Sequence, residues 1–468
     1  MRLLLVPSLS ALASALLLAV PIAAVLSRPS AAKAESAKND GKAQSSGGLA
    51  FPFPVKEKTL ANGLRVYVVA YDSPGLVAYY SVVRTGSRNE VEAGKSGFAH
   101  FFEHMMFRGT ARYSQDAYNA VIKEMGADSN AFTSDDLTVY HILAGKAALP
   151  KIVDIEADRF QHLQYKEPDF QKEARAVLGE YNKNASNPIE KMVEALYDNA
   201  FSTHTYKHTT MGFLKDIEDM PNQFGYSRQF FDRYYRPDNV TLLVVGDVDA
   251  ETVFGLVEKE YGGWARGPAR PPIPAEPQQK KGKQAELTWK GATLPMLMEG
   301  YHVPGFSTTN VDLPALDVLA ELLFAERAPL YKKLVINEQK VESLSGSADP
   351  HVDPNLFTIL ARIKKPGDIG YVQTAINDEI ARIAREGVDD RTLAEVLSHV
   401  KYGFAGQLST ADRTATTAAS FIALTGTLSS INEYFALYDK VTSADVKRVA
   451  QFYFTPSNRT VVTLKAGK

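Results

Sequence analysis

Apolar and polar positions alternate along several segments of the chain, and segments with helical spacing lie between them. Residues 64–71 (LRVYVVAY) and 77–86 (VAYYSVVRTG) follow the two-residue period of strands. Residues 116–127 (DAYNAVIKEMGA) and 149–163 (LPKIVDIEADRFQHL) repeat apolar side chains at the spacing of amphipathic helices. Two early strands, a run of helices and a closing strand do not form repeated βαβ units. The pattern therefore predicts an α+β fold with a largely antiparallel sheet and helices packed on one face.

The ends of the two halves of the chain resemble each other. YYRPDNVTLLVV closes the first half and FYFTPSNRTVVTL closes the second. Both predict the aromatic end of a helix, a Pro-x-Asn turn and a strand rich in Thr and Val. The matching residues lie 219 positions apart (456 − 237) and are Pro237, Asn239 and Thr241 against Pro456, Asn458 and Thr460. An internal duplication explains this pattern better than coincidence does.

Composition also divides the chain into segments. Residues 262–284 (GGWARGPARPPIPAEPQQKKGKQ) are rich in Pro, Gly and Lys and have no apolar period, which is typical of a linker. We therefore expect a first half at 51–261 and a second, homologous half at 285–468. Residues 35–50 are small and polar and predict a flexible tether.

The first 34 residues have the pattern of an export signal. Arg2 precedes an apolar run at 3–26, and Ala32, Lys33 and Ala34 form an A-x-A-like cleavage site. The run is also long enough to span a bilayer, so an uncleaved anchor is the alternative. We expect an exported, periplasmic protein, or one that is anchored at its N-terminus and faces the periplasm.

Composition narrows the possible chemistry. The chain has 52 basic and 54 acidic residues and a net charge of −2, so nothing indicates nucleic acid as a partner. It contains no cysteine, which excludes disulfides, thiolate catalysis and cysteine zinc ligands. Any bound metal must therefore be held by His, Asp or Glu.

Residues 97–110 (GFAHFFEHMMFRGT) place polar chemistry in a helix that is otherwise apolar. The pattern predicts Ser96 as the N-cap and Gly109 as the stop of this helix. His100, Glu103 and His104 share one face, and burying them without partners would cost several kcal/mol. Mutual hydrogen bonding in a core would resolve this, and so would a metal. Two His at i and i+4 can bind one Zn²⁺, and a Glu directly before the second His is the inverted zinc-peptidase order.

A catalytic zinc needs a third protein ligand. The expected helix at 169–184 (DFQKEARAVLGEYNKN) carries Glu173 and Glu180, of which one could bind the metal and the other orient a histidine. An amphipathic helix with solvated acids would show the same pattern. His204 and His208 also lie four positions apart, but among Ser, Thr and Gly, so we interpret them as part of a loop. At the repeat offset, the residues opposite the HxxEH trio are Leu319, Leu322 and Leu323.

Five segments follow one another in the order and spacing of the pitrilysin-type inverzincins, the family of insulin-degrading enzyme and mitochondrial processing peptidase. They are GFAHFFEHMMFRGT, NAFTSDDLTVYH (130–141), KEARAVLGEYNK, HTYKHTTMG and YYRPDNVTLLVVGDVD. This resemblance implies a zinc-dependent endopeptidase for peptides or unfolded protein segments, built as a clamshell of two duplicated halves. It implies that His100, His104 and Glu180 bind one Zn²⁺ per chain. It also implies that Glu103 is the base for the attacking water and that Glu173 is a supporting acid.

The resemblance also implies how substrate binds. Asn130, Ala131 and Phe132 resemble an edge strand that could receive a peptide as an added strand. An ordinary paired strand is the alternative. Active relatives, or their companion subunits, bind substrate with an Arg and a later Tyr in the second half. Arg327 matches the Arg, whereas Ser343 stands where the Tyr is expected.

Three functions are therefore possible. The first is the metal-bearing catalytic subunit of a hetero-oligomer, whose companion subunit lacks HxxEH and supplies an Arg/Tyr pair. The second is the same peptidase acting alone or as a homodimer. The third is a non-catalytic assembly or binding protein on the peptidase fold, which the intact ligands and base disfavour.

Overall fold

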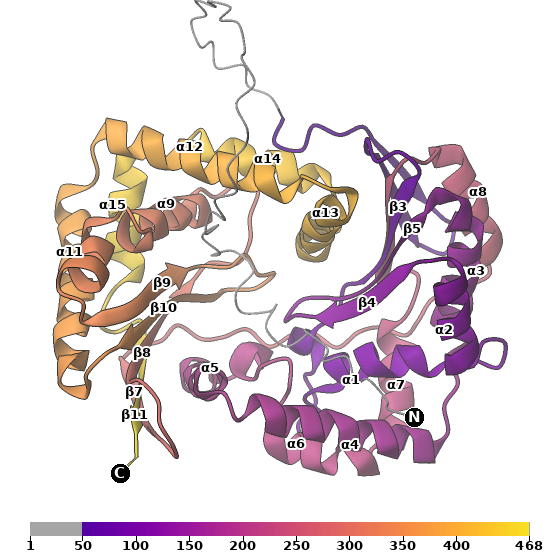
Figure 1. The fold of residues 1–468 in the computed structure, drawn as a ribbon, viewed down its shortest axis with the longest axis horizontal. Coiled ribbons are helices and arrows are strands. Elements are labelled where there is room, and N and C mark those ends of the chain that lie inside the picture. The colour runs from indigo at the N-terminus through magenta and orange to yellow at the C-terminus, as the bar shows by residue number, and fades with distance from the viewer. Residues whose placement is uncertain (1–48, 468) are drawn as a thin grey trace, which may run out of the picture.

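The structure, a computed structural model, describes residues 49–467 and consists of two α+β halves that face each other (Figure 1). The expected export signal at 1–34 and nearly all of the tether at 35–50 lie outside the described residues. From residue 49 to residue 467, no helix combines the length and the apolar character that crossing a membrane requires.

The first half is built on a six-stranded sheet with the order β1-β2-β6-β3-β5-β4. Neighbouring strands are antiparallel except β2 and β6, which are parallel. The strands are β1 (Val55–Thr59), β2 (Arg65–Ala70), β3 (Leu76–Val83), β4 (Asp128–Thr133), β5 (Thr138–Gly145) and β6 (Val240–Gly246). The helices on one side of it are α1 (Phe98–Met105), α2 (Gln115–Glu124), α3 (Leu149–His162), α4 (Glu167–Asn184), α6 (Leu214–Asp219), α7 (Phe224–Tyr234) and α8 (Ala250–Tyr261).

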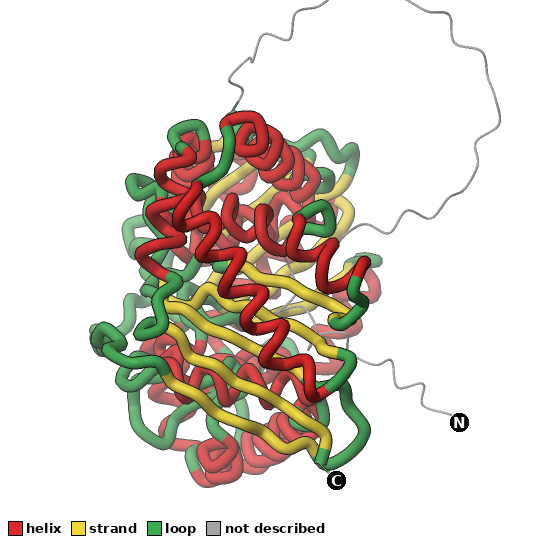
Figure 2. Tube along the Cα trace, turned by 90° about the vertical axis from the view of Figure 1, so that its left-hand side faces the viewer, coloured by secondary structure: helices red, strands yellow, loops and turns green. Residues whose placement is uncertain are grey.

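The second half repeats this plan on a five-stranded sheet with the order β7-β11-β8-β10-β9. Its strands are β7 (Lys283–Trp289), β8 (Met296–Val303), β9 (Val341–Ser347), β10 (Asn355–Ile363) and β11 (Arg459–Ala466). Figure 2 shows helices lying across the strands of this half. The helices of this half include α9 (Asp312–Phe324), α10 (Pro329–Tyr331), α11 (Ile369–Glu386), α12 (Asp390–Gln407), α14 (Ser429–Tyr438) and α15 (Ser443–Tyr453). The order matches β2-β6-β3-β5-β4, and β7 and β11 are again the parallel pair. The predicted fold class and the duplication are confirmed.

The repeated Pro-x-Asn turn has a structural reason in both halves. The Asn239 side-chain amide donates to the Tyr234 carbonyl at the end of α7 over 2.9 Å. The Asn458 amide makes the equivalent bond to the Tyr453 carbonyl at the end of α15 over 2.8 Å. Each amide satisfies a helix-terminal carbonyl that has no partner within its helix and so fixes where the closing strand begins.

Two helices cross from one half to the other. The first-half helix α5 (Pro188–Ala200) packs on β7, β8 and β11 of the second sheet. The second-half helix α13 (Ala411–Thr425) packs on β3 and β6 of the first sheet. Figure 1 shows α5 beside the second sheet and α13 beside β3. Tyr80 on β3 donates a hydrogen bond to Asp412 Oδ1 on α13 over 2.8 Å. Each sheet is therefore partly covered by a helix of the other half.

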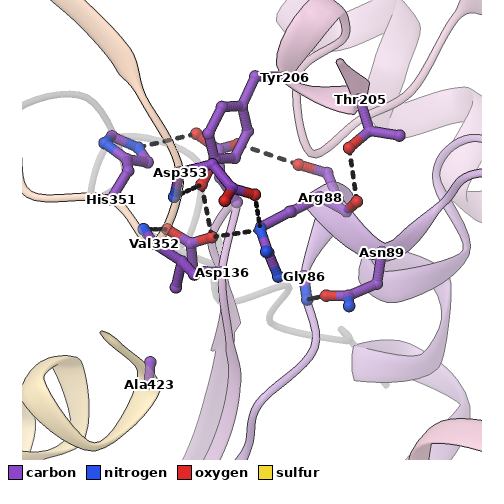
Figure 3. A network of polar contacts seen from close by, with 12 residues as sticks. Gly86, Arg88, Asn89, Asp136, Thr205, Tyr206, His351, Val352, Asp353 and Ala423 are labelled. Atoms are coloured by element: carbon purple, nitrogen blue, oxygen red, sulfur yellow. Dashed lines mark hydrogen bonds and ion pairs between the residues drawn. The ribbon is translucent and has the colours of Figure 1, made fainter. Parts of the chain in front are cut away.

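A polar network joins the halves beside the β4–β5 hairpin (Figure 3). His351 Nε2 lies 3.1 Å from Asp135 Oδ2, and the Val352 N–H donates to Asp136 Oδ2 over 3.1 Å. Asp353 Oδ2 lies 2.9 Å from His204 Nε2 and also pairs with a guanidinium of the first half. We call this network the inter-half clasp, and its members are Arg88, Asp135, Asp136, His204, Tyr206, His351, Val352 and Asp353.

Candidate metal centre and active site

The helix that carries the HxxEH motif starts one residue later than predicted. Gly97, not Ser96, is its N-cap, with φ at +89°, and a Cβ there would lie 2.3 Å from Ile217 Cδ1. The Ser96 hydroxyl instead donates to Asp216 Oδ2 over 2.6 Å. The N–H groups of Gly97 and Ala99 donate to the buried Glu90 carboxylate over 2.6 and 2.7 Å. A carboxylate from the preceding segment therefore replaces the local cap. The helical segment ends at Gly109, as predicted.

The structure brings His100, His104 and Glu180 together. Glu180 Oε2 on α4 lies 3.8 Å from His100 Nε2 and 3.4 Å from His104 Nε2 on α1. One ligand atom from each residue lies within 4.8 Å of the others. Four-coordinate zinc with bonds of about 2.0–2.1 Å separates its ligand atoms by roughly 3.3 Å, so this donor set fits zinc. The side chains of His104 and Glu180 are 27% and 21% exposed, which leaves one side of the set open.

The electrostatics of these groups suit a metal. Burial lowers the pKa of His100, which favours the neutral imidazole that a metal requires. The interaction with His104 lowers the pKa of Glu180 and so keeps it a carboxylate. His100 and Glu180 thus favour the protonation states in which they are metal ligands.

Glu173 lies behind His104 rather than with the three donors. Its Oε1 is 2.9 Å from His104 Nδ1, and its other oxygen pairs with Arg108. A carboxylate at Nδ1 leaves His104 Nε2 free of a proton and directed at the open site. Arg108 lies four residues after His104, on the same helical face, and this spacing could have identified it from the sequence.

Glu103 faces a pocket beside the donor set. The pocket has a volume of about 240 Å³, and its lining residues are Glu103, His104, Phe107, Arg108, Gln115 and Glu173. The Thr133 hydroxyl, at the end of β4, donates to Glu103 Oε2 over 2.7 Å. Thr133 was not among the residues expected from the sequence, although it directly follows the expected strand residues Asn130, Ala131 and Phe132.

The strand β4 that contains Asn130, Ala131 and Phe132 is at the edge of the first sheet and pairs only with β5. The Ser134 N–H bonds to the Leu137 carbonyl at the hairpin turn. Since bonded and non-bonded pairs alternate in an antiparallel ladder, the Ala131 N–H points away from β5. It donates instead to Asn130 Oδ1 over 2.9 Å. The outer edge of β4 therefore has no partner strand among the described residues, and the strand ends at Thr133, which contacts Glu103.

The remaining expected residues lie outside this cluster. Arg327 follows α9 in the second half and pairs with Glu321 over 2.7 Å. Ser343 is exposed on β9, the edge strand of the second sheet. His204 belongs to the inter-half clasp, and His208 Nδ1 lies 3.0 Å from the Thr209 carbonyl. His204 and His208 flank a short 3-10 helix (Thr205–Lys207), and neither belongs to the group of His100, His104 and Glu180 that could hold a metal.

Comparisons with known proteins agree with this geometry. The family described as Insulinase (Peptidase family M16) matches residues 68–213, and the one described as Peptidase M16 inactive domain matches residues 227–399. The zinc protease PqqE of Helicobacter pylori is 28% identical over 413 residues, which cover 87% of this chain and 92% of that protein. A probable mitochondrial-processing peptidase subunit beta of Arabidopsis thaliana is 24% identical, with 84% and 75% of the two chains covered.

Solved structures show the same fold. The crystal structure of a protease from Helicobacter pylori has a TM-score of 0.82 at 28% identity and covers 88% of this chain and 100% of that chain. The periplasmic protease PqqL from Escherichia coli shares the fold, with a TM-score of 0.72 at 19% identity over 88% of this chain and 47% of that chain. Together, the two family matches and these relatives show that the chain belongs to peptidase family M16, the insulinase or pitrilysin family.

Proposed function

We propose that this protein is a zinc-dependent endopeptidase that cleaves peptides or unfolded protein segments. The observation that carries the proposal is the meeting of His100, His104 and Glu180 beside Glu103 and an open pocket. The zinc protease relatives, which span most of the chain, support the same chemistry.

The proposal gives each residue a task. Zinc held by the three donors would supply Lewis acidity at the scissile carbonyl and make a water more acidic. Glu103, in the pocket beside them, would accept the proton of the attacking water and return it to the leaving amine. Glu173 would orient His104 through Nδ1. The free edge of β4 would hold the extended peptide through main-chain bonds, which gives affinity with little dependence on sequence.

We further propose that the chain is the metal-bearing subunit of a hetero-oligomer. Ser343 stands where the relatives' substrate-binding Tyr is expected, and the second half has Leu319 and Leu323 buried at the positions that match His100 and His104. The relative from Arabidopsis thaliana, a probable mitochondrial-processing peptidase subunit beta, supports an assembly of this kind. A companion chain that lacks HxxEH would then provide the Arg/Tyr pair. The same peptidase acting alone or as a homodimer is the alternative.

Metal analysis joined to a cleavage assay tests both proposals. The purified chain should contain close to one zinc, and a chelator should abolish cleavage of an unstructured peptide until zinc is restored. If the purified chain contains no metal and its slow cleavage is insensitive to the chelator, the proposed zinc-dependent peptidase activity is contradicted. If the zinc-loaded chain alone reaches a kcat/KM of about 10⁴ M⁻¹s⁻¹, the proposal that it needs a companion subunit is wrong.

A further inference from the structure

A threonine hydroxyl from the edge strand holds the carboxylate of the proposed base. Thr133 is the last residue of β4, and its Oγ1 donates to Glu103 Oε2 over 2.7 Å. Its side chain is buried, because residues 131 and 133 of β4 face α1. The strand that offers its free edge to a peptide therefore also contacts the base.

The surrounding hydrogen bonds direct the single proton of Thr133 to Glu103. Thr138, 3.4 Å away on β5, uses its own hydroxyl proton on the Thr85 carbonyl over 2.9 Å. The Asn239 amide in turn donates to Thr85 Oγ1 over 2.8 Å. Thr138 therefore donates its proton away from Thr133, and the Thr133 proton goes to the nearer acceptor, the Glu103 carboxylate at 2.7 Å.

A general base must keep one oxygen within hydrogen-bond reach of the proton that it accepts. A glutamate has several rotatable bonds, so a base without a partner would sample many positions in the pocket. A fixed donor on Oε2 restricts the carboxylate and leaves Oε1 free for the water. We propose that Thr133 is a positioning residue that holds Glu103 for proton transfer, an inference that rests on the proposed peptidase function.

The test compares two substitutions at this position. Thr133→Val keeps the shape and removes the hydroxyl, whereas Thr133→Ser keeps the hydroxyl. Thr133→Val should lower kcat roughly 10- to 100-fold with little change in KM, and Thr133→Ser should restore most of the loss. Zinc content should stay close to one per chain in both variants. A crystal structure of Thr133→Val should show the Glu103 carboxylate displaced while His100 and His104 stay in place.

Thr138→Val is the matched control, because it removes a buried hydroxyl bond one step away from the base. Thr138→Val should lose about as much stability as Thr133→Val, while its kcat should stay within a few-fold of the wild-type value. In a Glu103→Gln background, Thr133→Val should have no further effect, since the two residues act as one unit. If Thr133→Val is as active as the wild type, or raises KM at unchanged kcat, the proposed role of Thr133 is wrong, and the proposed peptidase function is unaffected. A zinc-loaded wild type that cleaves no peptide, even with its companion, would instead contradict the proposed function and, with it, this role.

Discussion

The two carboxylates of α4 differ in which nitrogen of His104 they contact. Glu180 Oε2 lies at Nε2, and Glu173 Oε1 lies at Nδ1. Spacing along the chain places both acids on one helix but says nothing about which ring atom each one reaches, so the residues alone left their roles open. The resemblance to a family ranks them, with Glu180 as the ligand and Glu173 as the supporting acid.

Substitutions of the two glutamates beside His100 and His104 should separate binding from catalysis. Glu180→Gln removes a charged donor and should lose most of the zinc and the activity. Glu103→Gln keeps all three donors and should retain close to one zinc per chain while losing nearly all turnover. Zinc quantification by mass spectrometry, run beside the cleavage assay, measures both effects. Substantial turnover in Glu103→Gln, or full zinc in Glu180→Gln, would contradict these roles.

Other residue contacts could not be predicted because their partners come from distant segments. Ser96 has the residue type and the position that are typical of an N-cap. In the structure the Glu90 carboxylate accepts the N–H bonds at the start of the helix instead, and the Ser96 hydroxyl donates to Asp216. Thr133 lies 30 residues from Glu103 along the chain, and only the folding of β4 against α1 brings them together. Local preferences describe the helix well, but they do not include competing groups from outside it.

Among the elements, β4 shows what a hydrophobic pattern can and cannot predict. Its half-alternating residues predicted a strand. Whether the strand is central or at an edge depends on which strands pair with it, and that is set by the order of the whole sheet. Its edge position was therefore implied only by the resemblance to a family, and in the structure β5 is its sole neighbour among the described strands.

A proline can test the free edge of β4 without disturbing its paired edge. Ala131→Pro removes an N–H that points away from β5, so the sheet ladder keeps its bonds. If substrate adds to this edge, the lost hydrogen bond should raise KM roughly 2- to 10-fold with zinc content unchanged. Ala131→Ser keeps the N–H and serves as the control. An unchanged KM in the proline variant, measured with an extended peptide, would show that substrate binds elsewhere.

At the scale of the whole molecule, the inter-half clasp depends on charge. Burial alone would lower the pKa of His351, but the hydrogen bond to Asp135 and the charge of Asp136 raise it to about 9. Burial would raise the pKa of Asp353, but hydrogen bonds with His204 and Arg88 lower it to about 2. Both clasp groups are therefore charged over a wide range around neutral pH.

The sign of the pH dependence follows from these shifts. Because the pKa of His351 is higher in the folded than in the unfolded protein, its contribution is complete below about pH 6.5 and is lost as pH rises through 9. This difference in the pKa of His351 between the folded and the unfolded protein corresponds to up to about 3 kcal/mol of stability. Asp353 contributes above about pH 4 and loses its contribution as pH falls through 2.

Thermal unfolding measured from pH 6 to pH 10 checks this expectation. The wild type should lose stability steeply between about pH 6.5 and 9, and His351→Gln should be less stable at pH 6 but have a flatter profile. His399→Gln is the control, since that histidine is largely exposed and lies 3.8 Å from Glu321, away from the clasp. If the stability of His351→Gln changes with pH in parallel with that of the wild type, the inter-half clasp is not the source of the pH dependence.

The duplication could be predicted from the sequence because the closing motifs of the two halves share turn residues that lie 219 positions apart. The crossing of α5 and α13 was not, because an amphipathic helix has the same periodicity whichever sheet it covers. The leucines opposite the HxxEH trio lie on a helix, as predicted, and Leu319 and Leu323 are buried in α9.

The crossing of α5 and α13 has a consequence for the ancestry of the chain. A single half standing alone would expose the sheet face that the other half's helix now covers. Two identical copies could each bury that face by trading the helix about a twofold axis, as domain-swapped homodimers do. The present chain has the architecture of such a dimer, in which the segment between α8 and β7 joins the two copies. Joining turns a bimolecular exchange into an intramolecular one, so the two halves stay paired whether or not both carry the histidines.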